Sequence, residues 1–463
     1  MSKQERTVEE SMEGAVVYNV PIPRDLKDMD GMAPIIVKSP YHVDYVHSYG
    51  QDSPFFAGLD LANYGVELIH PEIPLAHPLD DGRVALLERS VRATAAGLGV
   101  DGAAYQRLFG PLVHEAGETL PFILGPSLRI PRHPVAVARF GFGALWPAAA
   151  FARRHFHDDP ARALFAGLCS HSMVALDRPA TASFGLVLVM TAHAFGWPVV
   201  RGGTQRLADG LAAELRALGG EIVTGHPVKT LAELPAARAI LFDTSPRALV
   251  SIAGPALSAR YRRRLAGFRY GPGIVKVDWA LDGPIPWTAE GANRAGTVHV
   301  GGTLAEIAAA EAEVARGGHP ERPFVIVVQA SRFDPSRAPV GKHTGWAYAH
   351  VPNGSTVDIS ERIEAQVERF APGFRDQILA RSVRLPADLE RDNPNYVGGD
   401  INTGIEDIRQ LFTRPVARLD PYSTPTRGIY LCSSSTPPGG GVHGMCGVWA
   451  ARSALRREFG DRR

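Results

Sequence analysis

A glycine-rich stretch near the C-terminal end constrains this chain of 463 residues more than any other feature. Ile429 to Cys432 is short and apolar, as in a buried strand. The run Thr436-Pro-Pro-Gly-Gly-Gly-Val-His-Gly444 follows, and after Gly447 apolar residues recur at helical spacing, at Val448, Ala451, Leu455 and Phe459. The stretch predicts a strand, a glycine loop and a helix. Backbone N–H groups and the positive end of a helix dipole would then lie close to an anionic ligand such as a phosphate-bearing cofactor.

The whole run resembles the C-terminal flavin-contacting motif of the phytoene desaturase-like FAD-dependent oxidoreductases. In that family the loop lies along the flavin of FAD. The resemblance therefore implies a set of cofactor-binding residues in this loop, which are Thr436, Pro438, Gly439, Gly440, Gly441, Val442 and Gly444. The alternative is a tight turn with no ligand, for which three consecutive glycines are entropically costly.

Residues 201–244 contain a second unit with a glycine entrance. Gly202 and Gly203 precede a helical leucine pattern, and short strands are predicted at 221–223 and 238–242. This unit resembles the second FAD-domain segment of the same family, which adds Gly202, Gly203 and Val228 to the expected cofactor-binding residues. A plain helix–strand unit is the alternative from this stretch alone. Because neither unit completes a sheet by itself, we expect 201–244 and 401–459 to form one α/β layer.

The resemblance covers most of the chain and implies its fold class. We expect an α/β protein with a discontinuous, doubly wound FAD/NAD(P)-binding domain of the glutathione reductase type and an α+β substrate domain. The predicted parts are an atypical segment at 1–45, a mainly helical part of the substrate domain at 46–200, FAD-domain segments at 201–250 and 401–463, and the substrate-domain sheet with its helices at 251–400. Strands are predicted at 274–281, 297–300, 324–328 and 345–350, and a capping box at Thr303 and Glu306 begins a helix.

The N-terminal segment departs from the family pattern. Ala15 to Val20 predicts a strand, but Pro21 stands where the family has a G-x-G-x-x-G turn for the FAD pyrophosphate. A literal match at Gly97 to Gly102 follows a helix-like run at 86–95, so we interpret it as the end of a helix. With no glycine turn after the first strand, we expect FAD to be bound weakly or not at all.

Composition narrows the function classes. The net charge of +1 and the 21% of charged residues give no reason to expect a nucleic-acid partner. Cys169, Cys432 and Cys446 have neither metal-ligand nor disulfide spacing, which indicates a reducing, cytoplasmic location. No metal site and no catalytic residue can be named from a motif. His443 lies in the glycine loop, where we expect a packing or hydrogen-bonding role rather than acid–base chemistry.

Two apolar segments bear on the substrate and on membranes. Residues 179–200 carry no charge and approach the length of a membrane span, but their Thr, His and Pro residues favour a buried helix over a spanning one. The bulky residues at 140–151 (Phe140, Phe142, Leu145, Trp146 and Phe151) are expected in the core, with contact to a lipophilic substrate as the alternative. A lipophilic small molecule is the expected partner, and peripheral contact with a membrane is compatible with it.

Two functional hypotheses follow. The first is an FAD-dependent oxidoreductase that dehydrogenates a lipophilic or unidentified small molecule, since flavin chemistry asks little of protein side chains. The second is a cofactor-deficient relative that keeps the scaffold for binding or assembly.

Overall fold

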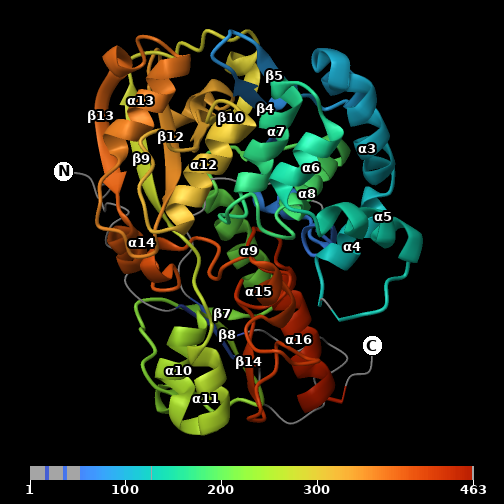
Figure 1. Ribbon diagram of the computed structural model, residues 1–463. Coiled ribbons are helices and arrows are strands. Elements are labelled where there is room, and N and C mark those ends of the chain that lie inside the picture. The colour runs from blue at the N-terminus through green and yellow to red at the C-terminus, as the bar shows by residue number, and fades with distance from the viewer. Residues whose placement is uncertain (1–15, 20–34, 39–52, 127, 461–463) are drawn as a thin grey trace, which may run out of the picture.

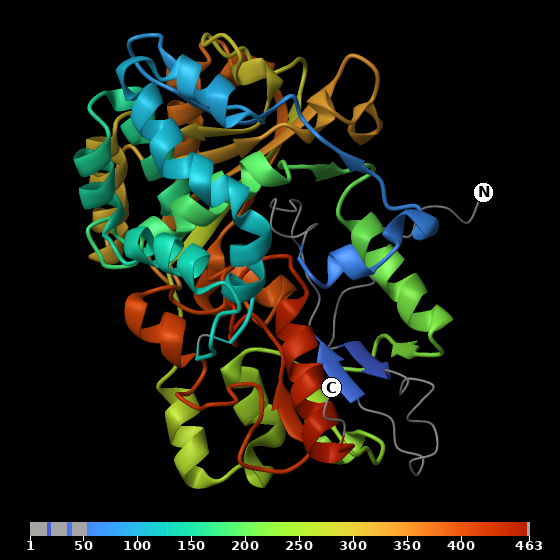
Figure 2. The same ribbon diagram turned by 90° about the vertical axis from the view of Figure 1, so that its right-hand side faces the viewer.

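The computed structural model describes residues 16–19, 35–38, 53–126 and 128–460. Two sheets organise them (Figure 1). A seven-stranded sheet and a layer of helices form the upper part of the view, and a five-stranded sheet with its own helices forms the lower part. Figure 2 shows the same division from the side of the helical layer.

The five-stranded sheet assembles strands from distant parts of the chain. Its order is β14-β8-β2-β1-β7, with bounds Ile429–Leu431, Ile240–Asp243, Ile35–Lys38, Val16–Asn19 and Glu221–Val223. β14 and β2 pair in parallel with β8. β1 is antiparallel to both of its neighbours, β2 and β7. The expectation that 201–244 and 401–459 share one layer is confirmed, and the strand predicted at 15–20 exists but runs against the others.

Helices cover both faces of this sheet, as in a doubly wound fold. Successive residues of β8 point to opposite faces. Phe242 packs with α10 (Pro246–Ala253) and α11 (Ala259–Ala266). Leu241 packs with Tyr430 and α16 (Met445–Glu458) on the other face.

The seven-stranded sheet has the order β13-β9-β12-β11-β10-β4-β5. The bounds are Ile378–Arg384, Gly273–Leu281, His343–Val351, Val325–Val328, Ala295–Val300, Ile73–Pro78 and Val84–Leu87. All neighbours pair antiparallel except β4 and β10. β9 to β12 match the four predicted strands. β4 was not predicted: all six of its residues are buried, so it shows no alternation, and it contains two prolines.

This sheet is covered on both faces as well. α13 (Ser360–Phe370) packs on one face through Ile363, Val367 and Phe370. α12 (Leu304–Ala315) joins the helical layer on the other face, and its predicted capping box between Thr303 and Glu306 is present. α14 (Pro386–Asp392) lies at the β13 end of the sheet (Figure 1).

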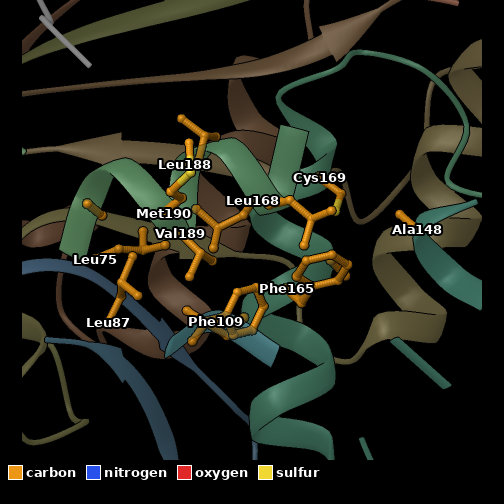
Figure 3. Close-up of a cluster of buried hydrophobic side chains, with 14 of the residues drawn as sticks. Leu75, Leu87, Phe109, Ala148, Phe165, Leu168, Cys169, Leu188, Val189 and Met190 are labelled. Carbon is orange, nitrogen blue, oxygen red and sulfur yellow. The ribbon is translucent and has the colours of Figure 1, made fainter. Parts of the chain in front are cut away.

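The helical layer consists of seven helices from the first half of the chain. They are α2 (Val91–Gly97), α3 (Gly102–His114), α4 (Ala116–Ile123), α5 (Pro134–Ala144), α6 (Ala148–His155), α7 (Asp159–Ser170) and α8 (Ala182–Ala194). Their core joins aromatic and aliphatic side chains from α3, α7 and α8 to the strands β4 and β5 (Figure 3). The prediction of a helix over 86–95 was wrong in part, because β5 occupies its first residues and the helix begins at Val91.

The glycines at 97–102 mark a helix junction, as predicted. α2 ends at Gly97, a short 3₁₀ turn (Gly99–Asp101) follows, and α3 begins at Gly102. A Cβ at Gly102 would collide with the carbonyl oxygen of Ala95. This glycine therefore serves close helix packing.

The uncharged segment 179–200 forms the buried helix α8, as predicted. Among the described residues, no single helix is long and apolar enough to cross a membrane. α5 and α6 together reach that length and apolarity, but they meet at a bend of 99°.

The bulky residues at 140–151 were predicted to lie in the core, and this is correct only for some of them. Phe151 is buried and Phe140 is partly buried against the core. Phe142, Leu145 and Trp146 are exposed. α5 packs only one of its faces on α8, which leaves these side chains outside.

Residues 53–70 and 199–217 connect the two parts. The first of these segments contains two 3₁₀ turns, Phe56–Gly58 and Leu61–Tyr64. β3 (Leu68–Ile69) pairs with β6 (Val199–Val200), and α9 (Gln205–Ala217) follows. α15 (Ile408–Thr413) lies next to the glycine loop in the chain's last part. Further 3₁₀ turns are Leu231–Glu233, Gly254–Ala256, Ala292–Arg294, Ala330–Arg332, Pro335–Arg337, Arg375–Gln377 and Val397–Gly399.

The contact between α7 and α8 gives a stability prediction. A Cβ at Gly185 would lie 2.5 Å from Sγ of Cys169 and 2.8 Å from Cε2 of Phe165, and all three residues are buried. We expect Gly185→Ala to lower the free energy of unfolding by about 1–3 kcal/mol, since an overpacked core must shift. Urea unfolding measures the change.

Gly117 in α4 is the matched control. Nothing lies within 4 Å of a Cβ built there, and the next residue is Glu118 rather than a proline. Gly117→Ala should leave the stability unchanged or raise it by about 0.5–1 kcal/mol, because alanine loses less backbone entropy in a helix. An equal loss of stability in the two variants would contradict the packing described for α7 and α8.

Candidate functional site

The glycine loop joins the five-stranded sheet to α16. β14 ends at Leu431 and α16 begins at Met445, so the predicted strand, loop and helix are all present. Within the loop Gly439 has φ 111°, Gly441 φ 126° and Gly444 φ 67°. Side-chain-bearing residues rarely adopt such values, which explains why glycine stands at these three positions.

Two of these glycines allow close packing inside the protein. A Cβ at Gly439 would collide with the guanidinium of Arg414, and one at Gly444 would collide with the ring of Phe55. Gly440 and Gly441 face in another direction, because both line a cavity. One side of the loop therefore packs on the protein through Gly439 and Gly444, and the other side faces the cavity through Gly440 and Gly441.

That cavity has a volume of about 410 Å³ and lies between the loop and the seven-stranded sheet with its helical layer. Pro438 and the backbone of 440–443 form one wall. The seven-stranded sheet forms another, through Lys276, Thr297, Trp346 and Tyr348. Residues of α4, α5, α8 and α15 complete the lining, which is mainly apolar. A ligand lying along the loop would thus face an apolar chamber.

The predicted cofactor-binding residues divide into two groups. Pro438, Gly440, Gly441 and Val442 line the cavity. Thr436, Gly439 and Gly444 lie behind them; the Thr436 hydroxyl, for example, donates to the Ser433 carbonyl at 2.7 Å. The cavity-lining group is the part of the loop that can touch a ligand there.

Gly202 and Gly203 lie at the entrance of α9, with φ 74° and 99°. The N–H of Gly202 donates to Oδ2 of Asp334 at 2.6 Å, so this donor is engaged within the protein. Val442 packs against the buried cluster that contains Leu207 of α9, which brings this helix beside the glycine loop. The two glycine entrances are therefore neighbours.

Val228 is buried in the same cluster as Phe242 of β8 and Leu249 of α10. Its side chain is part of the core of the five-stranded sheet. Only its backbone is available for the adenine contact that the resemblance implies.

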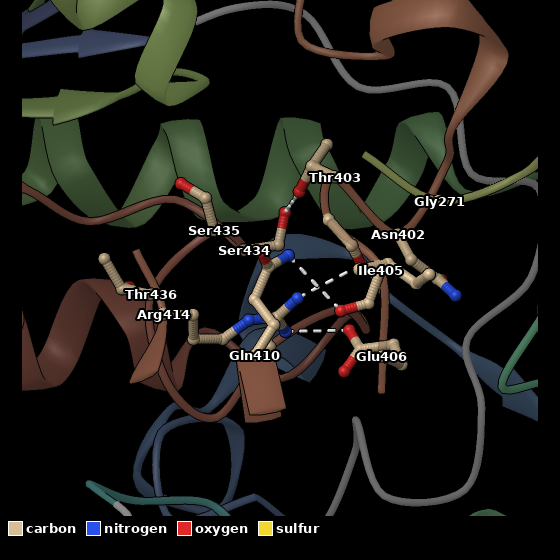
Figure 4. A network of polar contacts seen from close by, with 12 residues as sticks. Gly271, Asn402, Thr403, Ile405, Glu406, Gln410, Arg414, Ser434, Ser435 and Thr436 are labelled. Carbon is tan, nitrogen blue, oxygen red and sulfur yellow. Dashed lines mark hydrogen bonds and ion pairs between the residues drawn. The ribbon is translucent and has the colours of Figure 1, made fainter. Parts of the chain in front are cut away.

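A buried polar network fixes the back of the loop (Figure 4). Nη1 of Arg414 lies 2.7 Å from Oε1 of Glu406, and both side chains are buried. Nη2 of Arg414 donates to the carbonyl of Gly404 at 3.1 Å, and the hydroxyls of Thr403 and Ser434 are hydrogen-bonded to each other. Burial raises the pKa of Glu406, while Arg414 opposes the shift. An ion pair of this kind is costly to break, because one charge would be left buried alone.

Asp400 anchors the same segment to the seven-stranded sheet. Its carboxylate accepts from the N–H groups of Gly271 at 2.7 Å, Gly404 at 2.7 Å and Asn402 at 2.9 Å. Burial raises the pKa of Asp400 to about 6, and the three N–H donors limit the shift. The segment 400–414 thus connects the loop to both sheets.

His443 has the hydrogen-bonding role that we expected. Its Nε2 lies 3.2 Å from the Gly439 carbonyl, and its Nδ1 accepts from the N–H of Met445 at 3.0 Å. Burial lowers its pKa to about 4, so the ring is neutral at pH 7. The neutral imidazole ties the loop to the first turn of α16.

Sequence analysis did not identify the side chains of the opposite wall. Strand register places Lys276 opposite Tyr348 and Asp278 opposite Trp346. The Trp346 and Tyr348 rings are stacked, with centroids 6.2 Å apart and planes at 10°. The Lys276 ammonium pairs with Asp278 and lies 5.5 Å from the Trp346 ring centroid. The one available signal was a Lys and an Asp in an otherwise apolar strand.

The described residues fit the flavin end of FAD. Backbone of 440–443 lines the cavity without a large side chain from Gly440 or Gly441. At the carboxyl end of β8, the buried hydroxyl of Thr244 has no hydrogen-bond partner among the described residues. Doubly wound folds bind dinucleotides at this edge of the sheet. The region expected to hold the pyrophosphate, after β1, lies outside the described residues.

The part of the chain that the structure describes contains no group of three or more His, Cys, Asp or Glu residues that could hold a metal ion. Its three cysteines are buried and free, and burial raises the pKa of Cys446 to about 12.

No protein-family model matches the chain. It is similar to the pyridine nucleotide-disulfide oxidoreductase domain-containing protein 2 of two rodents. The Rattus norvegicus protein is 28% identical over an alignment of 329 residues that covers 61% of this chain and 56% of that protein. The Mus musculus protein is 27% identical over an alignment of 351 residues that covers 65% of this chain and 59% of that protein. The match thus spans little more than half of the length of these curated relatives.

Solved structures show the same fold at low identity. An oxidoreductase from Methanosarcina mazei aligns with a TM-score of 0.56 and 15% identity, over 92% of this chain and 89% of that one. Wild-type putrescine oxidase bound to putrescine aligns with a TM-score of 0.51 and 14% identity, over 87% and 86%. The predicted fold class, an α/β FAD/NAD(P)-binding fold, is confirmed. The narrower phytoene desaturase-like assignment stays a prediction.

The buried state of His443 predicts a pH dependence of stability. Its pKa is about 4 in the folded chain against 6.5 ordinarily, so below pH 6.5 the unfolded state binds a proton that the folded state excludes. The contribution of His443 to stability should therefore fall between pH 6.5 and 4, whereas Asp400, whose pKa burial raises to about 6, acts in the opposite direction. His77 and His193 act in the same direction as His443, because burial also lowers their pKa values to about 4.

His443→Gln isolates the contribution of this residue. Between pH 7 and 4 the variant should lose less unfolding free energy than the native chain, by up to about 3 kcal/mol. Urea unfolding at several pH values measures both chains. Parallel stability–pH curves would contradict a buried neutral imidazole at 443.

Proposed function

We propose that this chain is an FAD-dependent oxidoreductase that removes hydride from a neutral, lipophilic small molecule bound in the cavity. The observation that carries the proposal is the shared cavity: the backbone of the glycine loop forms one wall and apolar side chains form most of the others. The oxidoreductase names of the relatives and of the Methanosarcina structure support the reaction class. Putrescine oxidase supports an amine oxidase-like fold.

The charges of the cavity favour a neutral substrate over a cationic amine. Of the Lys, Arg, Asp and Glu residues in the described chain, only Lys276 and Glu406 line the cavity. Lys276 is paired with Asp278, and Glu406 with Arg414. The Trp346 ring, which could attract a cation, already has the Lys276 ammonium beside it. This pattern agrees better with the phytoene desaturase-like type than with amine oxidation.

Each part of the site has a distinct role. FAD, when bound, supplies the hydride acceptor. Gly440, Gly441 and Val442 would hold its flavin end, with the first turn of α16 behind them. The apolar lining excludes water and orients the substrate. Dehydrogenation also releases a proton, and His171 lines the cavity with Nε2 3.1 Å from Nε2 of His299, so this pair can accept the proton.

Gly441 and His443 provide a ranked test of cofactor binding. Gly441→Val places a side chain at φ 126°, where it is strained, and on the cavity wall, where it would displace a flavin. His443 also lines the cavity, but His443→Ala only removes hydrogen bonds to the loop backbone and adds no group that would displace a flavin. After purification with added FAD, the Gly441 variant should retain much less flavin by absorbance than the His443 variant. Equal losses would contradict the proposed contact surface.

The missing glycine turn predicts weak binding of FAD. Several charge-assisted N–H contacts to the pyrophosphate would be absent, each worth about 1.5–3 kcal/mol. The chain purified without added FAD should therefore be nearly colourless, and titration should show saturable binding with a low affinity.

Two outcomes of the titration would overturn parts of this account. Tightly bound, stoichiometric FAD would refute weak binding and leave the enzyme proposal standing. No binding at any FAD concentration, with the chain folded, would refute the enzyme proposal. It would favour the alternative, a cofactor-deficient relative that keeps the scaffold for binding or assembly.

A further inference from the structure

Exposed apolar side chains are concentrated in one short segment, residues 128–146, which we call the interfacial segment. It comprises the approach to α5, α5 itself and the turn before α6. Ile130 is 94% exposed, Phe142 81% and Val135 70%. Leu128, Leu145 and Trp146 are exposed as well. Large apolar patches on a protein surface mark interaction sites, so this segment needs a partner.

α5 has two apolar faces. Ala136 and Ala144 are buried, and Gly143 lies against Leu186 of α8. Val135 and Phe142, seven residues apart, share another face of the helix, which is open to solvent. α5 also lies at the outer edge of the helical layer (Figures 1 and 2). Packing among the residues that the structure describes therefore does not account for the open face.

The charge around the segment identifies the partner. No Asp or Glu occurs from 119 to 157, whereas this stretch contains Arg129, Arg132, Arg139, Arg153 and Arg154. Glu115 is paired with Arg139, and Glu118 lies 3.3 Å from His133, so the nearest carboxylates border the stretch. Arg132, Arg153 and Arg154 are exposed. Exposed apolar and aromatic side chains among cationic ones match the surface of an anionic lipid bilayer.

The substrate cavity reaches this same surface. Phe140, Ala144 and Leu145 contribute to its lining from the interfacial segment, and Leu411 and Phe412 contribute from the α15 side. Leu145 is 53% exposed and Phe412 50%. Side chains that line the cavity and also face solvent mark its opening. A molecule leaving a bilayer there would enter the cavity past apolar side chains.

We propose that the interfacial segment docks on an anionic membrane surface and that a membrane-dissolved substrate enters the cavity between Leu145 and Phe412. The entry of substrate rests on the proposed function, whereas the docking surface rests on exposure and charge alone.

Flotation with vesicles tests the docking. The full-length chain is mixed with phosphatidylcholine vesicles or with vesicles that also contain phosphatidylglycerol. It should float with the anionic vesicles, less with the neutral ones, and less again at high salt. The double variant Ile130→Asp/Phe142→Asp should bind at least about tenfold more weakly, since two apolar groups are replaced by carboxylates. The matched control Val340→Asp/Leu419→Asp changes two exposed apolar residues outside the segment and should float like the native chain.

Circular dichroism and thermal unfolding must first show that both double variants are folded, which their exposure favours. Hydrogen–deuterium exchange of the native chain gives an independent result, with protection by anionic vesicles expected over 128–146. A native chain that does not float, or a segment variant that floats equally well, would overturn the proposal. So would a vesicle-free dimer that the segment variant dissociates, because the patch would then be covered by a second copy. None of these measurements depends on flavin or on turnover. Failure of membrane docking can therefore be distinguished from failure of FAD binding.

Discussion

The structure of the site depends on the buried ion pair between Arg414 and Glu406. The guanidinium lies where a Cβ of residue 439 would otherwise be, so the pair and Gly439 require each other. Asp400 accepts from the N–H groups of Gly271 and Gly404. Together with Asp400, the ion pair therefore connects the glycine loop to the residues just before β9 of the seven-stranded sheet. Thr403, which is hydrogen-bonded to Ser434, holds a strained φ of 52° in the same segment. Loss of either charge would leave its partner buried alone and would release the loop.

This anchoring determines what the two parts of the protein can do together. The loop belongs to the five-stranded sheet, whereas Lys276, Trp346 and Tyr348 belong to the seven-stranded one. The segment 400–414 helps to hold the loop and the aromatic wall around one cavity. Within the cavity, Lys276 is paired with Asp278 and Glu406 with Arg414. Both charges of the lining are therefore neutralised by the protein itself and do not favour a charged substrate. The apolar opening of the cavity at α5 and α15 is consistent with a neutral substrate.

Local patterns predicted the parts of the structure that depend on nearby residues. The strand, glycine loop and helix at 429–458 follow from positive φ values and helical spacing, and the capping box at Thr303 from two side chains. Contacts across the sequence were not predictable. The pairing of Lys276 with Tyr348 needs strand register, and the fully buried β4 shows no alternation. Phe142 and Trp146 were assigned to the core because aromatic residues usually lie there, yet Phe142 lies on the open face of α5 and Trp146 in the exposed turn after it.

The central claim is that a flavin lies along the loop and faces an apolar substrate chamber. A crystal structure of the chain grown with a large excess of FAD tests it most directly. The account predicts the flavin ring against the backbone of 440–442, on the side of the cavity opposite Trp346 and Tyr348. Flavin bound elsewhere, or a cavity at that loop filled by the chain's own residues in the presence of bound FAD, would contradict it.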